Sequence, residues 1–206
     1  MIQLYGLPMS NYYSLVKALL EYKGLSYEEV KAPPTQDEDN LARTPMGKMP
    51  SIGVDGAYLS ESLAIATYLD GVAPSPALLP ADPFQAGKAM ELVCHVKLDI
   101  ELVARRCFPE ALFGQSVSDE VKSATHKDLA KGMAALQRIV VCEPYAAGRE
   151  LTLADFYMFY TFGLAGVVTQ KIWQEDLLEG HDNLQALMVR LREVPAIAKV
   201  EGEKAR

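Results

Sequence analysis

The first third of the chain alternates short apolar runs with one stretch of helical periodicity. Residues 2–5 and 26–30 are short runs typical of strands, and residues 14–23 between them carry Leu and Val at three- and four-residue spacing. This spacing places the apolar side chains on one face of a helix. The segment therefore predicts a strand, a helix and a second strand, and the two strands should be parallel because a helix joins them.

A second pair of short apolar runs indicates a hairpin. Residues 51–54 and 57–60 flank an Asp-Gly pair, which is favoured where both turn positions need a positive φ. Residues 61–69 then show helical spacing, and the polar stretch 36–40 is either a loop or a short helix. The predicted order of this part is β-α-β-(α)-β-β-α.

After residue 71 the pattern is helical to the end. Prolines cluster between residues 71 and 83, which is typical of a linker. No later segment has the alternation of a strand. The sequence therefore predicts two domains, an α/β domain over residues 1–77 and an all-α domain over residues 86–206, with a linker at 78–85.

Composition narrows the classes of function. The 206 residues are 50% apolar and carry a net charge of -7, from 20 basic and 27 acidic residues. An acidic chain without a Lys/Arg cluster disfavours nucleic acid as a partner. The chain does not open on a basic stretch followed by an apolar run, and it has no run of about 18 apolar residues. We therefore expect a cytoplasmic protein that does not insert into membranes.

The cysteines and histidines argue against disulfides and metals. Three cysteines at wide spacing favour free thiols in a reducing compartment, and no His or Cys pair has the spacing of metal ligands. All the cysteines fall in the predicted helical domain and none forms a Cys-x-x-Cys pair, which excludes a dithiol oxidoreductase. These residues are Cys94, Cys107, Cys142, His95, His126 and His181.

Three segments of the first domain carry candidate chemistry. Ser10 lies in the turn before the first helix, where its hydroxyl either caps the helix or helps the helix N-terminus to hold an anion. Pro50 directly precedes a predicted strand and is either an ordinary loop proline or a cis-proline. Glu61 and Ser62 begin a helix. They either interact favourably with the helix dipole, as first-turn residues do, or hold the ammonium and carboxylate of a ligand.

Together these segments resemble the glutathione S-transferase family. The resemblance extends over the whole chain and includes the order of strands and helices, Pro50 followed by Glu61 and Ser62, the linker Leu78–Pro83 and the segment Leu151–Phe156. It implies a thioredoxin-like, glutathione-binding N-terminal domain and the all-helical C-terminal domain of the family. It also implies glutathione as the co-substrate, a homodimer and no metal.

The resemblance assigns roles to individual residues. Met49 matches the position whose backbone pairs with the cysteinyl part of glutathione, and Pro50 matches the cis-proline after it. Glu61 and Ser62 match the pair that holds the γ-glutamyl end. Lys48 matches a position that contacts the glutathione backbone or its glycyl carboxylate.

The catalytic position is less regular. Ser10 matches the serine or cysteine beside the thiol, but Asn11 and the two tyrosines after it replace the usual Pro-Phe or Cys-Ser. Asn11 therefore either shares or replaces the role of Ser10. A hydroxyl donor at a helix N-terminus favours the thiolate, the nucleophilic form of a thiol whose free pKa is near 8.5. Tyr5 is about one residue out of register with the catalytic tyrosine of other classes, so we interpret it as structural.

In this family the electrophile site is lined by the first loop and the first long helices. Tyr12 on the loop and Arg106, Phe108 and Phe113 near the end of the long helix are the candidates, with Arg105 beside them. The alternative for the arginines is an exposed helix end with solvated charges. Cys107, between these residues, is either a reactive thiol or an inert one.

The second domain also has a folding motif. Thr152 and Asp155 precede an apolar run with the spacing of a capping box, and Leu151 with Phe156 resembles a hydrophobic staple. We assign this segment to folding, and expect the loss of Asp155 to cost about 1 kcal/mol, the scale of one cap.

Three functions remain open. The leading one is a glutathione transferase in detoxification, which joins the glutathione thiolate to electrophiles or uses it to reduce peroxides or disulfides. The second is a glutathione-dependent cis–trans isomerase, as in the maleylacetoacetate isomerase branch, although the Ser-Ser-Cys motif of that branch is not found here. The third is a glutathione-binding interaction module without enzymatic activity.

Overall fold

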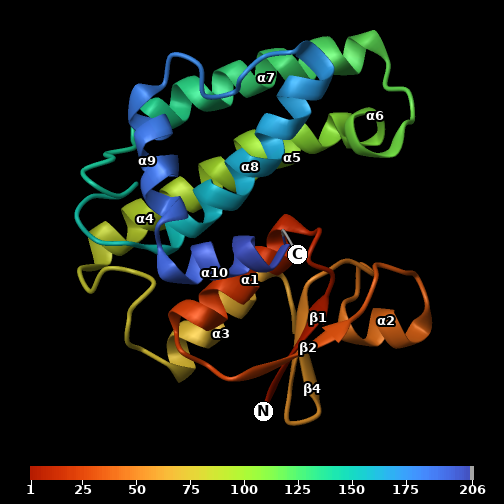
Figure 1. Cartoon of the computed structure of the whole chain (residues 1–206), viewed down its shortest axis with the longest axis vertical. Coiled ribbons are helices and arrows are strands. Elements are labelled where there is room, and N and C mark those ends of the chain that lie inside the picture. Colours follow the sequence, from red (N-terminus) through yellow and green to blue (C-terminus); the bar gives the residue numbers. More distant parts are fainter. Residues whose placement is uncertain (205–206) are drawn as a thin grey trace. The chain divides into compact units, whose positions relative to one another are not determined.

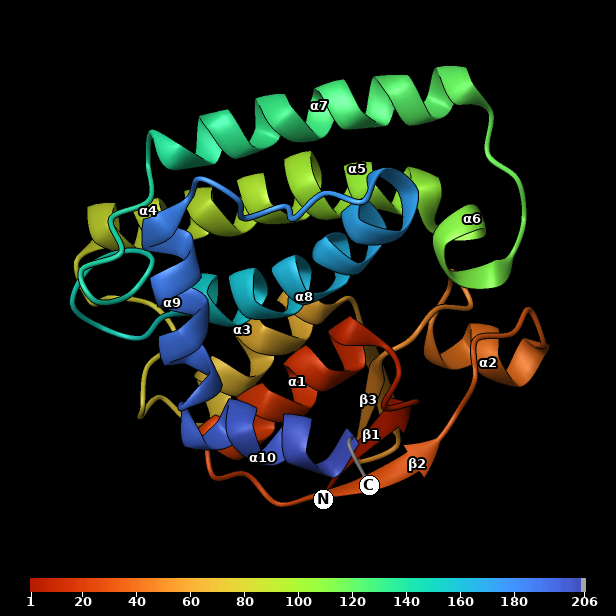
Figure 2. The ribbon, with the colours of Figure 1, turned by 45° about the horizontal axis from the view of Figure 1, so that its top comes forward.

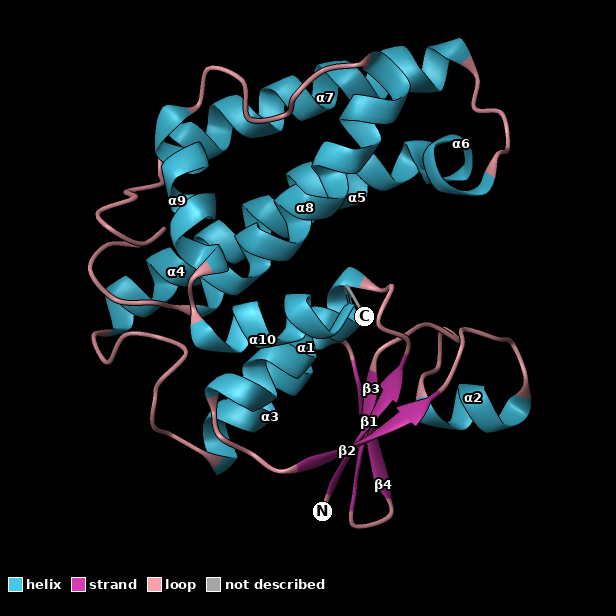
Figure 3. Ribbon diagram, viewed as in Figure 1, coloured by secondary structure: helices cyan, strands magenta, loops and turns pink. Residues whose placement is uncertain are grey.

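A small mixed sheet is built from residues 2–60. β1 (Ile2–Gly6) pairs in parallel with β2 (Tyr27–Lys31) and antiparallel with β3 (Ser51–Val54), which pairs with β4 (Ala57–Ser60). The computed structural model describes residues 1–204, and within them the strand order is β2-β1-β3-β4 (Figure 3). The predicted parallel pair and the predicted hairpin are both confirmed.

The hairpin turn has the predicted backbone. Asp55 and Gly56 have φ values of 49° and 84°. Both values are positive, as the Asp-Gly pair suggested. The hairpin therefore fixes the register of β3 against β4.

The helices of this part cover both faces of the sheet. α1 (Asn11–Tyr22) and α3 (Ser62–Val72) pack against each other. The side chains of Leu4 and Ile52 are fully buried. α2 (Glu38–Arg43) packs against β3 and β4, and its Arg43 lies over the ring of Tyr5, 5.4 Å from the ring centre. The polar stretch before β3 therefore contains a short helix, one of the two predicted alternatives.

The last helix returns to the α/β part of the chain. α10 (Pro195–Lys204) packs against α1, and Figure 2 shows the two helices side by side. By their contacts, residues 1–78 and the segment from Arg192 onward form one unit, and residues 79–191 form the other. The predicted domain boundaries, 1–77 and 86–206, stay a prediction. What helical periodicity did not reveal is the partner of α10, which is α1.

Lys23 anchors the chain where it leaves the α/β unit. Its ammonium group is fully buried and donates to the Asp70 carboxylate and to the carbonyl oxygens of Ala73 and Pro76. Asp70 also accepts from the backbone N–H of Leu78. One lysine therefore uses its three donors to tie the end of α1 to the segment that follows α3.

We expect Lys23→Met to lower the free energy of unfolding by about 2 kcal/mol, because two carbonyls and a carboxylate lose their donor. The expected loss of stability is moderate because Asp70 is partly exposed to solvent. Chemical denaturation measures this change. Lys199→Met removes the cation of the ion pair between α10 and Glu21 of α1, in which the lysine is exposed and not buried, and is the control. Equal losses in the two variants would contradict the anchoring role.

The second unit is helical. Its helices in chain order are α4 (Pro83–His95), the π-helix η1 (Val96–Glu101), α5 (Leu102–Ala104), the 3-10 helix η2 (Arg105–Cys107), α6 (Phe108–Phe113), α7 (Asp119–Gln137), α8 (Leu153–Trp173) and α9 (Asp182–Arg192) (Figure 1). α8 packs against α4, η1 and α6, and most of its first ten residues are fully buried. Within residues 1–204, no helix has the length and apolar content needed to cross a membrane.

The predicted capping box begins α8. The Asp155 carboxylate, which is fully buried, accepts from the backbone N–H of Thr152 at 2.8 Å and from the Thr152 hydroxyl at 3.1 Å. It also accepts from the backbone N–H of Ala146, nine residues earlier, at 2.8 Å. The carboxylate thus holds the preceding loop as well as the helix start, which the sequence pattern did not predict.

Candidate functional site

The three motif segments of the α/β unit meet at one end of the sheet. Tyr5 of β1 pairs with Ser51 of β3, and Ser51 pairs with Ser60 of β4, so these residues form one row across the sheet. The turn after β1, the loop before β3 and the residues after β4 all leave the sheet at this row. Tyr5 and Ser60, 55 positions apart in the sequence, therefore lie in the same row.

Ser10 caps α1 through its side-chain oxygen. Its Oγ accepts from the backbone N–H of Tyr13 at 3.3 Å, and Ser14, which is buried, donates its hydroxyl to the Pro8 carbonyl at 3.2 Å. A hydroxyl can accept and donate at once, so the capping role and a role towards a ligand are compatible. Asn11 is the first residue of the helix.

The loop before β3 depends on one glycine. Gly47 has a φ of 65°, and a Cβ at this position would lie 2.3 Å from the Thr35 carbonyl oxygen. Its N–H donates to the Thr44 carbonyl at 2.8 Å. The tight turn that results leads into Lys48, whose side chain is exposed, and into Met49. The Met49–Pro50 peptide bond is cis, as one of the two interpretations of the sequence required.

The residues after β4 have an unusual backbone. Glu61 is exposed and has φ 69° and ψ 117°, a conformation that residues with a side chain rarely adopt. Ser62 follows it as the first residue of α3 and is buried. Strained backbone of this kind concentrates at ligand sites. The helix N-terminus beside it favours negative charge.

The helical unit holds the other predicted residues. Arg106, Phe108 and Phe113 lie on the consecutive short helices η2 and α6. Arg106 forms an ion pair with Asp128 at 2.6 Å, and Phe113 is 68% exposed. Tyr12 belongs to the first turn of α1 in the other unit. The structure thus groups three of the four electrophile candidates within one unit.

Cys107 of the helical unit and Tyr5 of β1 are the two other residues whose role the sequence raised. Cys107 is fully buried, and burial raises the pKa of its thiol, which makes it a poor nucleophile. Tyr5 donates its hydroxyl to the Gln3 side chain at 2.8 Å. Over residues 1–204, no group of three or more His, Cys, Asp or Glu side chains is arranged to hold a metal ion.

Sequence reasoning missed Tyr13 and its contacts. The side chain of Tyr13 is 2% exposed and lies in the first turn of α1, and its hydroxyl donates to the Glu29 carboxylate on β2. A Cβ at Gly6 would lie 2.5 Å from the Tyr13 ring. The motif pattern gave roles to Ser10, Asn11 and Tyr12 but none to Tyr13, and the φ of 154° at Gly6 cannot be read from the sequence.

Comparison with known proteins agrees with these features. Residues 4–77 match the model of the glutathione S-transferase N-terminal domain, and residues 108–202 match that of the C-terminal domain. A protein of Pseudomonas putida named glutathione S-transferase is 38% identical over 204 residues, covering 99% of this chain and 93% of that protein. A maleylacetoacetate isomerase of Pseudomonas aeruginosa is 28% identical, covering 69% of this chain and 71% of that protein.

The fold agrees with solved structures. A glutathione S-transferase from Methylobacterium radiotolerans, crystallised in complex with glutathione sulfonate, superposes with a TM-score of 0.80 at 24% identity. The match covers 97% of this chain and 93% of that chain. The thioredoxin-like N-terminal domain and the helical C-terminal domain are therefore the architecture of this chain.

Proposed function

The chain belongs to the glutathione S-transferase family, and we propose that it binds glutathione at the end of its sheet and activates the thiol for attack on an electrophile. The observation that carries the proposal is the row formed by Tyr5, Ser51 and Ser60. At this row the turn with Ser10, the loop with Met49 and the residues after β4 come together. The proposal therefore does not depend on any single motif.

The chemistry of these residues fits a peptide-like anion. The Ser62 hydroxyl and the N-terminus of α3 suit the γ-glutamyl carboxylate, and Glu61 suits the ammonium group beside it. Lys48 is exposed and offers a cation to the glycyl carboxylate. The backbone of Met49, directly before β3, suits the extended cysteinyl part of the ligand.

The proposed reaction begins with loss of the thiol proton to solvent. Ser10, with its Oγ already accepting from Tyr13, donates a hydrogen bond from its hydroxyl to the thiolate sulfur. The sulfur then forms a bond to the electrophilic carbon. The electrons of the bond that breaks at this carbon pass to a leaving group, or to a conjugated acceptor that takes up a proton. Peroxide or disulfide reduction uses the same thiolate. Asn11 is the auxiliary donor in this proposal.

We expect Ser62→Ala to weaken glutathione binding about tenfold or more, since a hydrogen bond to a charged group contributes about 1.5–3 kcal/mol. Isothermal titration calorimetry with glutathione measures the loss. Thr67→Ala is the matched control, because Thr67 lies on the same helix and donates only to the Leu63 carbonyl. Equal affinities in the Ser62 variant and the wild type would reduce Ser62 to a residue of the helix start.

The second substrate is part of the same proposal. We propose that it contacts Arg106, Phe108 and Phe113 of the helical unit, whose aromatic side chains favour an apolar or aromatic electrophile. Tyr12, in the other unit, stays a separate candidate from the sequence. Turnover of a chromogenic electrophile by the wild type and by Phe113→Ser tests this assignment. A variant with unchanged KM for the electrophile would remove Phe113 from the site.

A homodimer is the proposed assembly. Leu98 on η1 and Leu102 on α5 are four residues apart and are 53% and 46% exposed. A pair of exposed leucines on consecutive helical segments is suited to an interface. Sedimentation at micromolar concentration tests this, and we expect Leu98→Lys to shift the protein towards monomer. A wild type that is only monomeric would contradict the proposal. A cytoplasmic location and a role in detoxification belong to the same proposal.

An isomerase is the second candidate function, because a relative named maleylacetoacetate isomerase matches over more than two thirds of both chains. In that reaction the thiolate would add to a conjugated cis double bond and leave after rotation. The residues at the candidate thiol position are Ser10 and Asn11 instead of the Ser-Ser-Cys of that branch, so we rank it second. Parallel assays with a cis-unsaturated keto acid and a chromogenic electrophile distinguish the two. Binding of glutathione without turnover of either would favour the interaction module.

A further inference from the structure

The ring of Tyr13, in the first turn of α1, packs against Gly6 at the end of β1, close to the proposed glutathione site. A Cβ added to Gly6 would lie 2.5 Å from the Tyr13 ring and 3.4 Å from the Cβ of Met49. The end of β1 thus comes close both to this ring and to the loop before β3. The backbone N–H of Tyr13 also donates to the Oγ of Ser10 at 3.3 Å. Any shift of Tyr13 therefore displaces the residue that we propose to hold the thiolate.

The other end of the Tyr13 side chain is fixed by charged residues. Its hydroxyl donates to Glu29 on β2, whose second oxygen accepts from Lys17 at 2.7 Å. Lys17 has a side chain that is only 8% exposed, and it also pairs with Glu203 on α10 at 2.5 Å. The order of contacts is Tyr13, Glu29, Lys17, Glu203, and it connects α1, β2 and α10.

The charges in this network stabilise one another. Burial acts to lower the pKa of Lys17, but its hydrogen bonds with Glu203 and Glu29 outweigh burial and raise it. Burial acts to raise the pKa of Glu29, but its hydrogen bonds with Lys17 and Tyr13 outweigh burial and lower it. Both groups are therefore charged across the neutral range, and Glu29 remains a strong acceptor for the Tyr13 hydroxyl.

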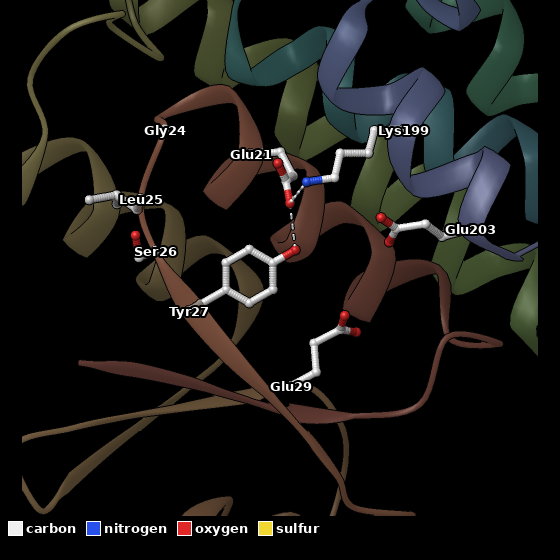
Figure 4. A pocket seen from close by; sticks show the side chains of 8 residues that line it. All are labelled: Glu21, Gly24, Leu25, Ser26, Tyr27, Glu29, Lys199 and Glu203. Atoms are coloured by element: carbon white, nitrogen blue, oxygen red, sulfur yellow. Dashed lines mark hydrogen bonds and ion pairs between the residues drawn. The ribbon is translucent and has the colours of Figure 1, made fainter.

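The opposite end of α1 offers a second network of the same kind. Tyr27 donates its hydroxyl to Glu21 at 2.7 Å, and Glu21 pairs with Lys199 on α10 at 2.7 Å. Figure 4 shows these three side chains together, with Glu29 and Glu203 facing the same open pocket of about 530 Å³. Glu21 lies in the last turn of α1, away from Ser10. The first network includes the start of α1 and the second includes its last turn, and both reach α10.

We propose that Tyr13 is a positioning residue for the thiol-binding turn, held in place by Glu29 and Lys17 and, through Lys17, by Glu203 of the C-terminal helix α10. This inference rests on the proposed function, because it concerns the turn that carries Ser10. It assigns α10 a role in glutathione activation although α10 supplies no residue that contacts glutathione in the proposal.

The test compares two tyrosine variants that lose the same kind of bond. Tyr13→Phe keeps the ring against Gly6 but loses the bond to Glu29, and Tyr27→Phe loses the bond to Glu21. We expect Tyr13→Phe to raise the apparent pKa of the bound glutathione thiol by about 0.5–1 unit, because the thiolate loses about three- to tenfold of its stabilisation. Tyr27→Phe is expected to leave this pKa unchanged. Thiolate absorbance of the complex against pH measures it.

A second readout does not require glutathione. The amides of Tyr13 and Ser14 both bond to Ser10, through its Oγ and its carbonyl. We expect their hydrogen exchange to accelerate about fivefold in Tyr13→Phe and to stay at the wild-type rate in Tyr27→Phe. Equal exchange and equal thiol titration in the two variants would overturn the positioning role. A wild type that fails to bind glutathione would overturn the proposed function, and amide exchange would still decide whether Tyr13 positions the turn.

The role of α10 is tested by a second matched pair. Glu203→Ala removes one of the two carboxylate partners of Lys17, and Lys199→Ala removes the cationic partner of Glu21. We expect Glu203→Ala to accelerate exchange of the same two amides about twofold, since Glu29 still holds Lys17, and Lys199→Ala to leave it unchanged. Equal effects of the two substitutions would overturn the part assigned to α10.

Discussion

Replacing Asp155 with alanine is expected to lower the free energy of unfolding by about 3 kcal/mol. The change removes the acceptor of two backbone N–H groups, those of Ala146 and Thr152, and of the Thr152 hydroxyl. Each buried donor that loses its acceptor costs about 1–3 kcal/mol. The sequence motif alone suggested about 1 kcal/mol, the cost of one cap, because the bond to Ala146 is visible only in the structure.

The matched control is Asp82→Ala. Asp82 begins α4 and accepts from the N–H of Gln85 at 2.9 Å at an exposed position. We expect this variant to lose about 1 kcal/mol. Denaturant unfolding followed by circular dichroism measures both, and Asp155→Asn should fall between them because its amide keeps one acceptor oxygen. Equal losses in the two alanine variants would show that the bond to Ala146 adds no stability.

The sequence predicted a strand or helix correctly wherever a single local rule determined it. The hairpin strands 51–54 and 57–60 agree residue for residue, since Asp-Gly has few other conformations. The first helix begins at Asn11 and not at residue 14. Its first residues are polar or aromatic and do not carry the apolar periodicity that marked its start in the sequence.

The sequence did not predict the contacts between segments that are distant along the chain. Nothing in the periodicity of residues 195–204 shows that they pack against α1, or that Glu203 reaches Lys17. The convergence of Ser10, Met49 and Ser62 at one end of the sheet was suggested only by resemblance, and the register of β1, β3 and β4 now accounts for their proximity. The individual roles of these residues remain predictions.

Ser10→Ala is expected to have the largest effect on activity. If Ser10 donates to the thiolate, its loss removes about 1.5–3 kcal/mol and raises the pKa of the bound thiol by about one to two units. Turnover at about pH 6.5 should then fall about 10- to 100-fold, in proportion to the thiolate fraction. At about pH 9 the thiol ionises unaided, so the loss should be much smaller.

Ser10→Ala also removes the N-cap of α1. The effect of that loss on stability has to be separated from the effect on the thiol. Ser118 begins α7 and accepts from the N–H of Val121 at 3.4 Å, as Ser10 does from Tyr13. Ser118→Ala should lose about 1 kcal/mol of stability or less and keep the wild-type pH profile. A pH-dependent loss of turnover specific to Ser10→Ala therefore reports on the thiol and not on the helix.

Asn11 decides between the remaining interpretations. Because the Ser10 hydroxyl accepts from Tyr13 and keeps its proton, we expect Ser10 to lead and Asn11→Ala to shift the thiol pKa by less than Ser10→Ala. The measurement is the pH profile of turnover together with the thiolate absorbance of the glutathione complex. A shift in Asn11→Ala alone would transfer the role to Asn11. If neither variant shifts the thiol pKa, two explanations remain: the backbone N–H groups at the start of α1 stabilise the thiolate without a side-chain donor, or the chain is not a transferase. Turnover of a chromogenic electrophile by the wild type separates these two outcomes.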